Sequence, residues 1–302
     1  MSYLKKSKKI RIKISNQKRM RYNSEKLKAV ETFEIMNVFR SGSTVPVRLK
    51  TDRGEMVAKW TKSAQGPINN ISDWIGLNLA RELGLDSPKT FIVHVKRRIA
   101  NSVRETEIRE MIEKSEGLNL GIEYLESFSQ CDSEQLDRIS KEQKELCFLF
   151  DVLFLNFDRD RNNTNIIGNG TLYSWVDFAS LMEVICLVTK QSQPPTSVWE
   201  RLRYHPFYQE DLNFKFLKKM DRERIRKVLD GLPDVWLEVY DSDALHLREE
   251  LFLRIDFLLT NFESLFQERI EKIQKIEYRT KEEIAEEQGR KRKDFEKRFG
   301  KF

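Results

Sequence analysis

The chain has 302 residues, 39% hydrophobic and 34% charged, a globular composition and a length sufficient for one large core or two lobes. Its 12 glycines and seven prolines are too few for a turn-rich all-β architecture and favour a helix-rich one. The longest apolar run, residues 146–157, contains Asp151 and is too short for a membrane span, and the N-terminus lacks the apolar stretch of a secretory signal, so we expect a cytoplasmic protein without a transmembrane segment.

The net charge of +6 is concentrated at the N-terminus. Residues 1–30 contain eleven Lys or Arg and a single acidic residue, Glu25, so the remainder is mildly acidic. A basic arm at residues 1–28 is typical of a solvated tail, and the alternative is a segment that contacts nucleic acid or an acidic partner. Only Tyr3 and Tyr22 interrupt it, so the aromatic residues that a single-strand binder stacks on bases are nearly absent.

The three cysteines and three histidines show no spacing typical of a disulfide framework, a zinc site or a catalytic triad. Free thiols are therefore expected at Cys131, Cys147 and Cys186. The histidines, interpreted as surface or satisfied core residues, are His94, His205 and His246.

The first part of the chain alternates apolar and polar residues with a period of two, which predicts strands. Expected strands lie at residues 33–39, 45–49, 56–60, 91–95 and 121–125, with turns at 41–44 and 51–54. After Gly66-Pro67, apolar residues at helical spacing predict a helix at residues 69–83 that ends at Gly84. The charged segment 96–114 gives no clear prediction.

The second part is mostly helical. An amphipathic helix is expected at residues 140–156, followed by a hairpin whose strands are 165–167 and 171–176. The longest later helix has an apolar stripe, interpreted as core packing with a dimer seam as the alternative. The stripe consists of Leu247, Leu251, Ile255, Leu258, Phe262 and Leu265.

This order predicts an α+β fold with two lobes and a ligand cleft between them. The expected divisions are a basic arm at 1–28, a strand-rich N-lobe at 29–125, a helical C-lobe at 126–270 and a charged helix or tail at 271–302.

Carboxylates and amides gather directly after the apolar helix. Four residues separate Asp158 from Asn163, and Asp177 follows the hairpin. Kinase-type phosphoryl transfer needs one carboxylate for the attacking hydroxyl, and an amide and a second carboxylate to hold Mg²⁺ against the phosphates. Hard oxygen ligands suit Mg²⁺. The spacing therefore favours a nucleotide and metal site, although Asn165 is better interpreted as support for the hairpin.

The N-terminal half supplies the matching groups. Lys59 lies on the third expected strand, where a kinase keeps its phosphate-pairing lysine, and Asp73 on the next helix could pair with it. The turn formed by Ser41, Gly42 and Ser43 could offer backbone N–H and hydroxyl groups to a phosphate.

Together these motifs resemble the HipA-like kinases, in particular the small HipA-like domain proteins of bacteria. The resemblance covers about residues 30–190, with a weaker match to about residue 270. It rests on an ordered set of segments at residues 42–47, 56–59, 65–67, 73–75, 79–85, 121–125, 156–159, 163–165 and 175–177.

The resemblance implies a protein-kinase-like fold that uses ATP and Mg²⁺ to phosphorylate a serine or threonine hydroxyl of a protein. It implies Asp158 as the catalytic base, with Asn163 and Asp177 as Mg²⁺ ligands. It also implies Lys59 as the phosphate contact, supported by Asp73, and the turn at Ser41, Gly42 and Ser43 as the phosphate loop. Adenine would meet backbone groups of Glu123, Tyr124 and Leu125.

Two residues depart from the family pattern. Asp73 stands where the family usually has Glu, and Asp160 stands where related phosphotransferases often have His. A second carboxylate at this place could compete for metal or raise the pKa of a neighbour. Open alternatives are a lipid or small-molecule kinase, another nucleotidyl transfer, and a pseudokinase or nucleic-acid-associated interaction module.

Overall fold

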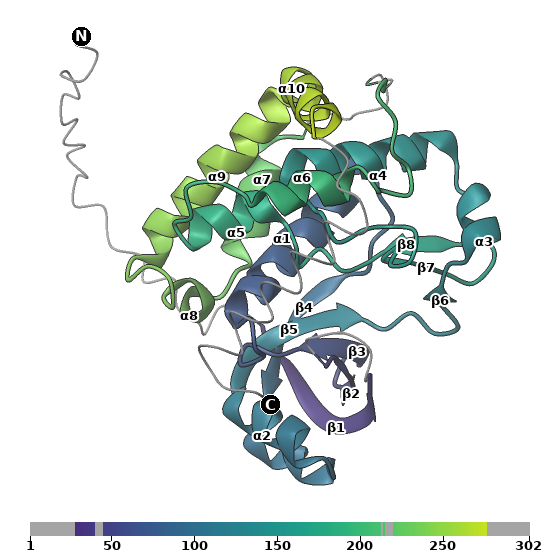
Figure 1. Ribbon diagram of the computed structural model, residues 1–302. Coiled ribbons are helices and arrows are strands. Elements are labelled where there is room, and N and C mark those ends of the chain that lie inside the picture. The colour runs from purple at the N-terminus through teal and green to yellow at the C-terminus, as the bar shows by residue number, and fades with distance from the viewer. Residues whose placement is uncertain (1–27, 40–44, 213, 215–219, 277–302) are drawn as a thin grey trace, which may run out of the picture.

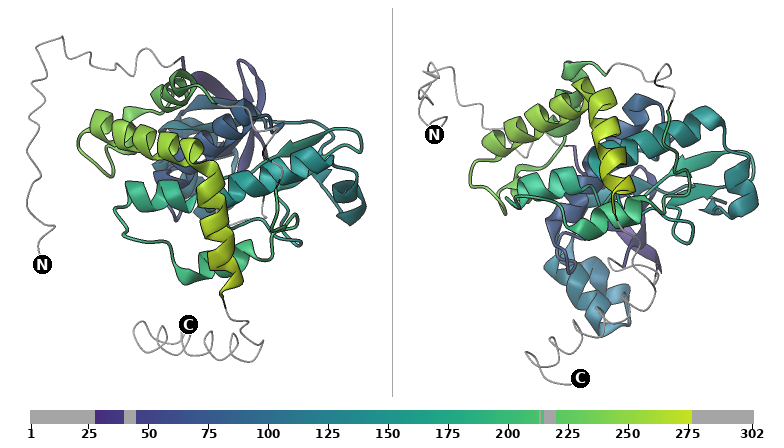
Figure 2. Two further views of the ribbon diagram at one scale, coloured as in Figure 1. Left: turned by 90° about the horizontal axis from the view of Figure 1, so that it is seen from above. Right: turned by 45° about the horizontal axis from the view of Figure 1, so that its top comes forward.

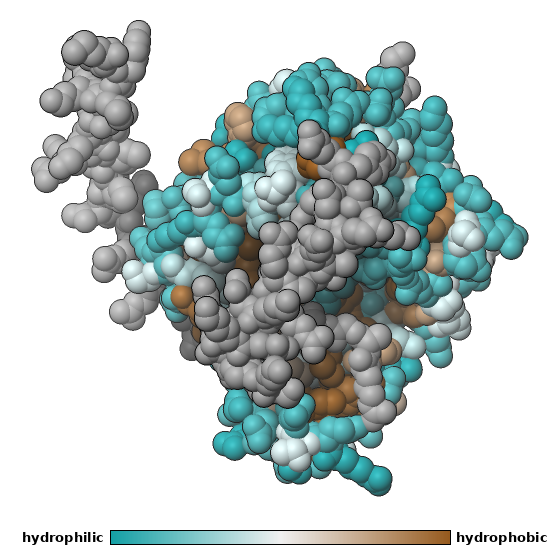
Figure 3. Space-filling model, in the orientation of Figure 1, coloured by the Kyte–Doolittle hydropathy of each residue, from teal (hydrophilic) through white to brown (hydrophobic). Residues whose placement is uncertain are grey.

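The computed structural model describes residues 28–39, 45–212, 214 and 220–276 (Figure 1). Nearly all of the basic arm, the turn at Ser41, Gly42 and Ser43, and the tail after residue 276 lie outside the described residues. The described chain is mixed α and β, as expected. Hydrophilic side chains predominate on the face shown in Figure 3. None of the helices in these ranges is long and apolar enough to cross a membrane.

Five strands close into a barrel in the order β1-β2-β3-β5-β4. The strands are β1 (Val30–Val38), β2 (Val47–Thr51), β3 (Gly54–Lys59), β4 (Thr90–Val95) and β5 (Gly117–Glu123). The expected strands are present, but the sheet closes on itself because β1 also pairs with β4, in parallel, at Val30 and Glu31. Two register shifts interrupt the pairing of β1 with β2, and irregularities of this kind bend and twist a strand.

A second, small core fills the barrel. It contains Val47, Leu49, Met56 and Val93, and all four are at most 1% exposed. The segment without a clear sequence prediction adds to this core through the 3₁₀ helix η2 (Arg97–Ser102) and the helix α2 (Thr106–Lys114), whose Ile112 is fully buried.

Helix α1 (Pro67–Leu83) lies between the barrel and the remaining helices (Figure 1). Pro67 begins it, and Gly84 ends it at φ 107°, a left-handed conformation that favours glycine. The helix contacts β4 and β5 on one side and α5 (Met182–Val188), α7 (Arg222–Asp230) and α8 (Asp234–Leu237) on the other.

Helix α4 (Lys141–Phe154) begins at Ser140, whose hydroxyl accepts the backbone N–H of Gln143 at 3.3 Å. The short helix α3 (Ser133–Asp137) precedes it. The expected hairpin follows it as β7 (Ile166–Gly168) and β8 (Tyr173–Trp175), and β6 (Ser129–Gln130) adds a third strand.

The long helix expected at residues 247–265 is in fact two helices. Helix α9 (Ala244–Thr260) ends at Asn261, and α10 (Phe262–Gln274) leaves in another direction, as Figure 2 shows. Thr260 and Asn261 are poor helix formers, and Asn261 lies at φ −109° and ψ 24°, outside the helical region. The stripe on α9 packs into the core as predicted, whereas α10 packs against α4 and α6 (Thr196–Leu202).

Candidate functional site

Lys59 links three separate elements of the fold. Its Nζ lies 2.7 Å from Asp73 Oδ2 on α1 and 2.9 Å from Asp177 Oδ1 in the loop after β8. Lys59 is 6% exposed and Asp73 is fully buried. The ion pair expected from the sequence between Lys59 and Asp73 is therefore present, and Asp177 shares the same ammonium group.

The electrostatics of this triad follow from burial and mutual attraction. Burial of Lys59 disfavours its charge, but Asp177 and Asp73 outweigh that effect and raise its pKa. Burial likewise opposes the charge of Asp177, and Lys59 offsets this and keeps its pKa below the usual range. For Asp73, burial and the repulsion by Asp177 prevail over Lys59 and raise the pKa to about 6. The single ammonium group thus stabilises the charged form of Asp177 more than that of Asp73.

Helix α1 also fixes the loop that carries Asp177. The backbone N–H of Phe178 donates to Asp73 Oδ1 at 2.7 Å, so both oxygens of Asp73 are engaged. Asp177 has a φ of 57°, a left-handed conformation that is uncommon outside glycine and collects at functional sites. Gly76, one turn after Asp73, allows the close approach of Phe178.

The loop after α4 is tied to itself by amide groups. Asn163 Nδ2 and Asn165 Nδ2 donate to the Asp158 carbonyl oxygen at 2.9 Å and 3.3 Å. Asp160 Oδ1 accepts the backbone N–H groups of Asn162 and Asn163 at 2.7 Å and 2.9 Å. The departure at Asp160 therefore has a structural role in this loop, because its carboxylate caps the turn that leads to Asn163.

The carboxylate of Asp158 is half-buried and close to one cation. Arg201 Nη2 at the end of α6 lies 3.4 Å from Asp158 Oδ1. Burial, and then the repulsion by Asp177, raise the pKa of Asp158, while Arg201 acts in the opposite direction and Asp160 adds to the rise. Asp160 thus affects the pKa of its neighbour in the direction expected from the sequence.

A buried cluster below this loop was not predicted. Arg159 Nε donates to Asp151 Oδ2 at 2.7 Å, and Arg159 Nη1 donates to the carbonyl oxygens of Thr164 and Asn165 at 2.6 Å and 2.7 Å. Asp151 Oδ1 accepts from Asn156 Nδ2 at 2.8 Å. The cluster therefore attaches the loop to α4. The signal in the sequence was Asp151, a single carboxylate within an apolar run. A buried charge requires a partner, so this residue indicated that a cation would lie beside it.

His205 completes this cluster. Its Nδ1 accepts the backbone N–H of Phe207, so its Nε2 carries the proton and donates to Asp151 Oδ2 at 2.9 Å. Burial lowers the pKa of His205. Cys147 Sγ lies 3.8 Å from the same oxygen, and Cys147, Asp151 and His205 are close enough to bind a metal. Because Arg159 and Asn156 already occupy Asp151, the cluster fits a structural role better than a metal site.

The expected adenine segment lies at the end of β5. The backbone N–H groups of Glu123 and Tyr124 donate to the carbonyl oxygens of Lys89 and Glu55 at 2.8 Å and 3.1 Å. The Tyr124 ring also lies under Arg48, at 3.9 Å. The Leu125 carbonyl oxygen accepts the N–H of Phe128 at 3.4 Å, so a base would have to contact other backbone groups of this segment, such as the Leu125 N–H.

The cysteines are free, as expected. Cys131 and Cys147 are buried and Cys186 is partly exposed.

One comparison with known proteins identifies a family. A family model described as HipA-like kinase matches residues 32–265. Among solved structures, the crystal structure of the Helicobacter pylori proinflammatory kinase CtkA is similar with a TM-score of 0.46 and 14% sequence identity, over 83% of this chain and 100% of that chain. No curated protein matches the chain.

Proposed function

Because the chain belongs to the HipA-like kinase family, we propose that it transfers the γ-phosphoryl group of ATP to a serine or threonine hydroxyl of a protein. In this proposal the barrel and the helical part act as two lobes, and ATP with Mg²⁺ binds between them. The observation that carries the proposal is the position of Lys59, whose Nζ lies within 2.9 Å of both Asp73 and Asp177.

The proposed role of Lys59 is to neutralise charge on the phosphates. Asp73 holds the ammonium group in place, and its own position is fixed by the N–H of Phe178. A cation that is already positioned stabilises the charge of the transition state without reorganisation. The turn at Ser41, Gly42 and Ser43 is the proposed cover for the phosphates.

Asn163 and Asp177 are the proposed Mg²⁺ ligands, and their chemistry fits that ion. The Asn163 amide nitrogen donates to the Asp158 carbonyl, which leaves the amide oxygen as the group for a metal. Asp177 supplies a carboxylate, and both ligands are hard oxygen donors. A bound Mg²⁺ would neutralise charge on the transferring phosphate.

Asp158 is the proposed base for the acceptor hydroxyl. The amides of Asn163 and Asn165 fix its backbone, and its side chain is 33% exposed, so a substrate can reach it. One oxygen of the carboxylate would accept the hydroxyl proton as the oxygen of the acceptor attacks the γ-phosphorus. The bond between the γ-phosphorus and the bridging oxygen breaks at the same time, and ADP leaves with the electron pair of that bond.

The test is incubation with Mg·ATP followed by intact-mass measurement of the protein and of candidate protein substrates. We expect a mass increase of one phosphate with the wild-type chain, and a rate lowered by about 10² to 10⁴ in Asp158→Asn and Asp177→Asn. Asp230→Asn, at the exposed end of α7, is the matched control and should behave as wild type.

Other outcomes of this measurement identify other functions. Equal phosphorylation by Asp158→Asn and wild type would contradict the assigned base. An increase of one adenylyl group would indicate nucleotidyl transfer, and nucleotide binding without any transfer would indicate a pseudokinase.

A further inference from the structure

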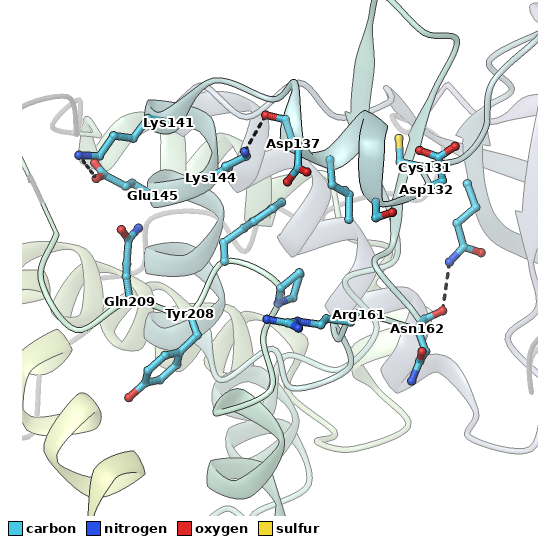
Figure 4. Close-up of a pocket in the computed structure, with 15 residues that line it drawn as sticks. Cys131, Asp132, Asp137, Lys141, Lys144, Glu145, Arg161, Asn162, Tyr208 and Gln209 are labelled. Carbon is cyan, nitrogen blue, oxygen red and sulfur yellow. Dashed lines mark hydrogen bonds and ion pairs between the residues drawn. The ribbon is translucent and has the colours of Figure 1, made fainter.

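Two adjoining cavities flank the loop that follows Asp158. One has a volume of about 680 Å³ and the other of about 810 Å³, and both are lined by Arg161, Asn162, Pro206 and Tyr208. Figure 4 shows Arg161 extending between Asn162 and Tyr208 in the larger of the two. Since they share these four residues, the two cavities adjoin, and we name the pair the loop groove.

We propose that the loop groove binds the protein segment that carries the acceptor hydroxyl, and that it selects segments with acidic residues beside that hydroxyl. This inference rests on the proposed kinase function. It adds a class of substrate, acidic peptide segments, and a site that would recognise them.

The charge in the smaller cavity favours an anionic ligand. Arg161, Arg201 and Arg203 line it, against one acidic residue, Asp160. Asp160 already accepts two backbone N–H groups through Oδ1. In the part of the chain that the structure describes, the exposed Arg161 side chain makes no hydrogen bond or ion pair. Arginine forks bind carboxylates well, so this cavity suits Asp or Glu side chains.

Arg203 lines this cavity as well. Its Nη1 donates to the carbonyl oxygen of Ile276 at 3.0 Å. The bond orients the side chain.

Arg201 connects the cavity to the proposed base. It lines the cavity and its Nη2 lies 3.4 Å from Asp158 Oδ1. A hydroxyl that approaches Asp158 has to share this carboxylate with Arg201. An acidic residue in the groove offers Arg201 a second carboxylate, and thereby frees Asp158 for the hydroxyl.

The size of the groove favours a peptide over a small metabolite. Each cavity alone is within the ~300–1,000 Å³ of a small-molecule pocket, and the groove combines two. In the larger cavity the charges balance, because the acidic residues Asp132, Asp137 and Glu145 line it together with Lys141, Lys144 and Arg161. The acidic preference should therefore be confined to the few positions that enter the smaller cavity.

The test compares serine-containing peptides that carry Asp and Glu with peptides that carry Asn and Gln at the same positions. Binding is measured by fluorescence anisotropy with the Asp177→Asn protein, and phosphorylation is measured as kcat/KM with Asp177 intact. We expect wild type to favour the acidic peptide about tenfold in both measurements, a modest ratio for partly exposed ion pairs. Arg161→Gln should reduce this ratio, and Arg161→Glu should abolish it.

Arg98→Glu is the matched control. Arg98 is an exposed residue of η2, away from the groove, and its reversal makes the same change in net charge. The ratio should stay at the wild-type value in Arg98→Glu. Residues 1–28 are present in every variant, so any general attraction of the basic arm for acidic peptides affects all of them equally.

The outcomes separate the two proposals. If peptides are phosphorylated without an acidic preference, or if Arg98→Glu lowers the ratio as much as Arg161→Glu, the loop groove is not the selective site. If acidic peptides bind in an Arg161-dependent way but are never phosphorylated, the kinase proposal fails while the groove stands as a site for acidic segments.

Discussion

Arg159 donates to Asp151 at 2.7 Å, and the side chains of both residues are completely excluded from solvent. Burial alone would raise the pKa of Asp151, but Arg159 and His205 outweigh it and hold the pKa below its usual range. The charge pair supports Asp158 from within the core. Arg159 is the next residue in the chain, and it also donates to the carbonyl oxygens of Thr164 and Asn165 in the same loop. The position of the proposed base therefore depends on a carboxylate of α4.

The substitution Asp151→Asn should destabilise the protein strongly. It leaves the guanidinium group of Arg159 buried without its countercharge, and the removal of one partner of a buried pair costs about 3–5 kcal/mol. Urea denaturation measures the free energy of unfolding. The exposed control Asp230→Asn should change it by less than about 0.5 kcal/mol. A similarly small change in Asp151→Asn would show that this pair contributes little to stability.

The protonation of His205 should make stability depend on pH. Its folded pKa is lowered by burial, beside Asp151 and Arg159, so the unfolded chain binds this proton more readily than the folded chain does. Stability should therefore fall as pH decreases through the usual histidine pKa of about 6.5 toward the lower folded value. Thermal or urea unfolding between pH 7 and 5 would measure the slope.

Two histidine variants make this measurement specific. His205→Gln should be less stable at neutral pH and should show a shallower decline, because the titrating group is gone. His246→Gln, at an exposed position of α9, should keep the wild-type slope. An unchanged slope in His205→Gln would assign the pH dependence to other groups.

The substitution Lys59→Met should leave Asp73 and Asp177 facing each other without their cation. Loss of a positioned cation in a site of this kind lowers the rate by about 10² to 10³. Lys59→Arg should not restore activity, since the planar guanidinium cannot occupy the place of the compact ammonium group between two carboxylates. Steady-state phosphorylation kinetics measure both variants.

Lys50→Met provides the control for Lys59→Met. Lys50 is an exposed residue of β2 in the same barrel. A loss of activity in Lys50→Met as large as that in Lys59→Met would point to damage of the barrel in general.

The substitution Gly76→Ala should lower activity through Phe178. A Cβ at this position would lie 2.2 Å from Phe178 Cβ, a distance that only a backbone shift can relieve. Alanine gains about 1 kcal/mol of helix propensity over glycine, which offsets part of the ~1–3 kcal/mol cost of overpacking. The free energy of unfolding should therefore change little. The displacement of the loop that carries Asp177 should nevertheless lower the activity.

The measurement for Gly76→Ala is kcat/KM beside urea unfolding. Glu82→Ala, later on the same helix, makes a surface change without contact to Phe178 and should keep wild-type activity. Full activity in Gly76→Ala would mean that the loop tolerates the shift.

Local patterns in the sequence were sufficient to predict most elements. Period-two alternation predicted the barrel strands, and helical spacing with Pro67 and Gly84 predicted α1 nearly to its ends. The pairing of Lys59 with Asp73 was predicted from their places on a strand and the following helix. These features depend on neighbours in the chain, where spacing is informative.

The features that were missed depend on contacts between distant segments. His205 meets Asp151 across 54 positions, and neither residue stands in a motif. The barrel closes where Val30 and Glu31 of β1 pair with Val93 and His94 of β4, and a pattern of hydrophobicity does not show which distant strands pair. The break at Asn261 was hidden because the apolar stripe continues across it, although α9 packs mainly against α5 and α7, and α10 packs mainly against α4 and α6.

Helix α1 belongs to the core on both of its sides, and 13 of its 17 residues are buried. Its cover is encoded late in the chain: Trp74 Nε1 donates to the Val228 carbonyl at 2.8 Å, and Trp236 Nε1 donates to the Leu118 carbonyl of β5 at 2.9 Å. During synthesis, α1 is made early, but its apolar surface cannot be buried until residues 222–237 have left the ribosome. The apolar side chains of α1 lack their cover throughout this interval, so folding is expected to begin late in synthesis and to be cooperative.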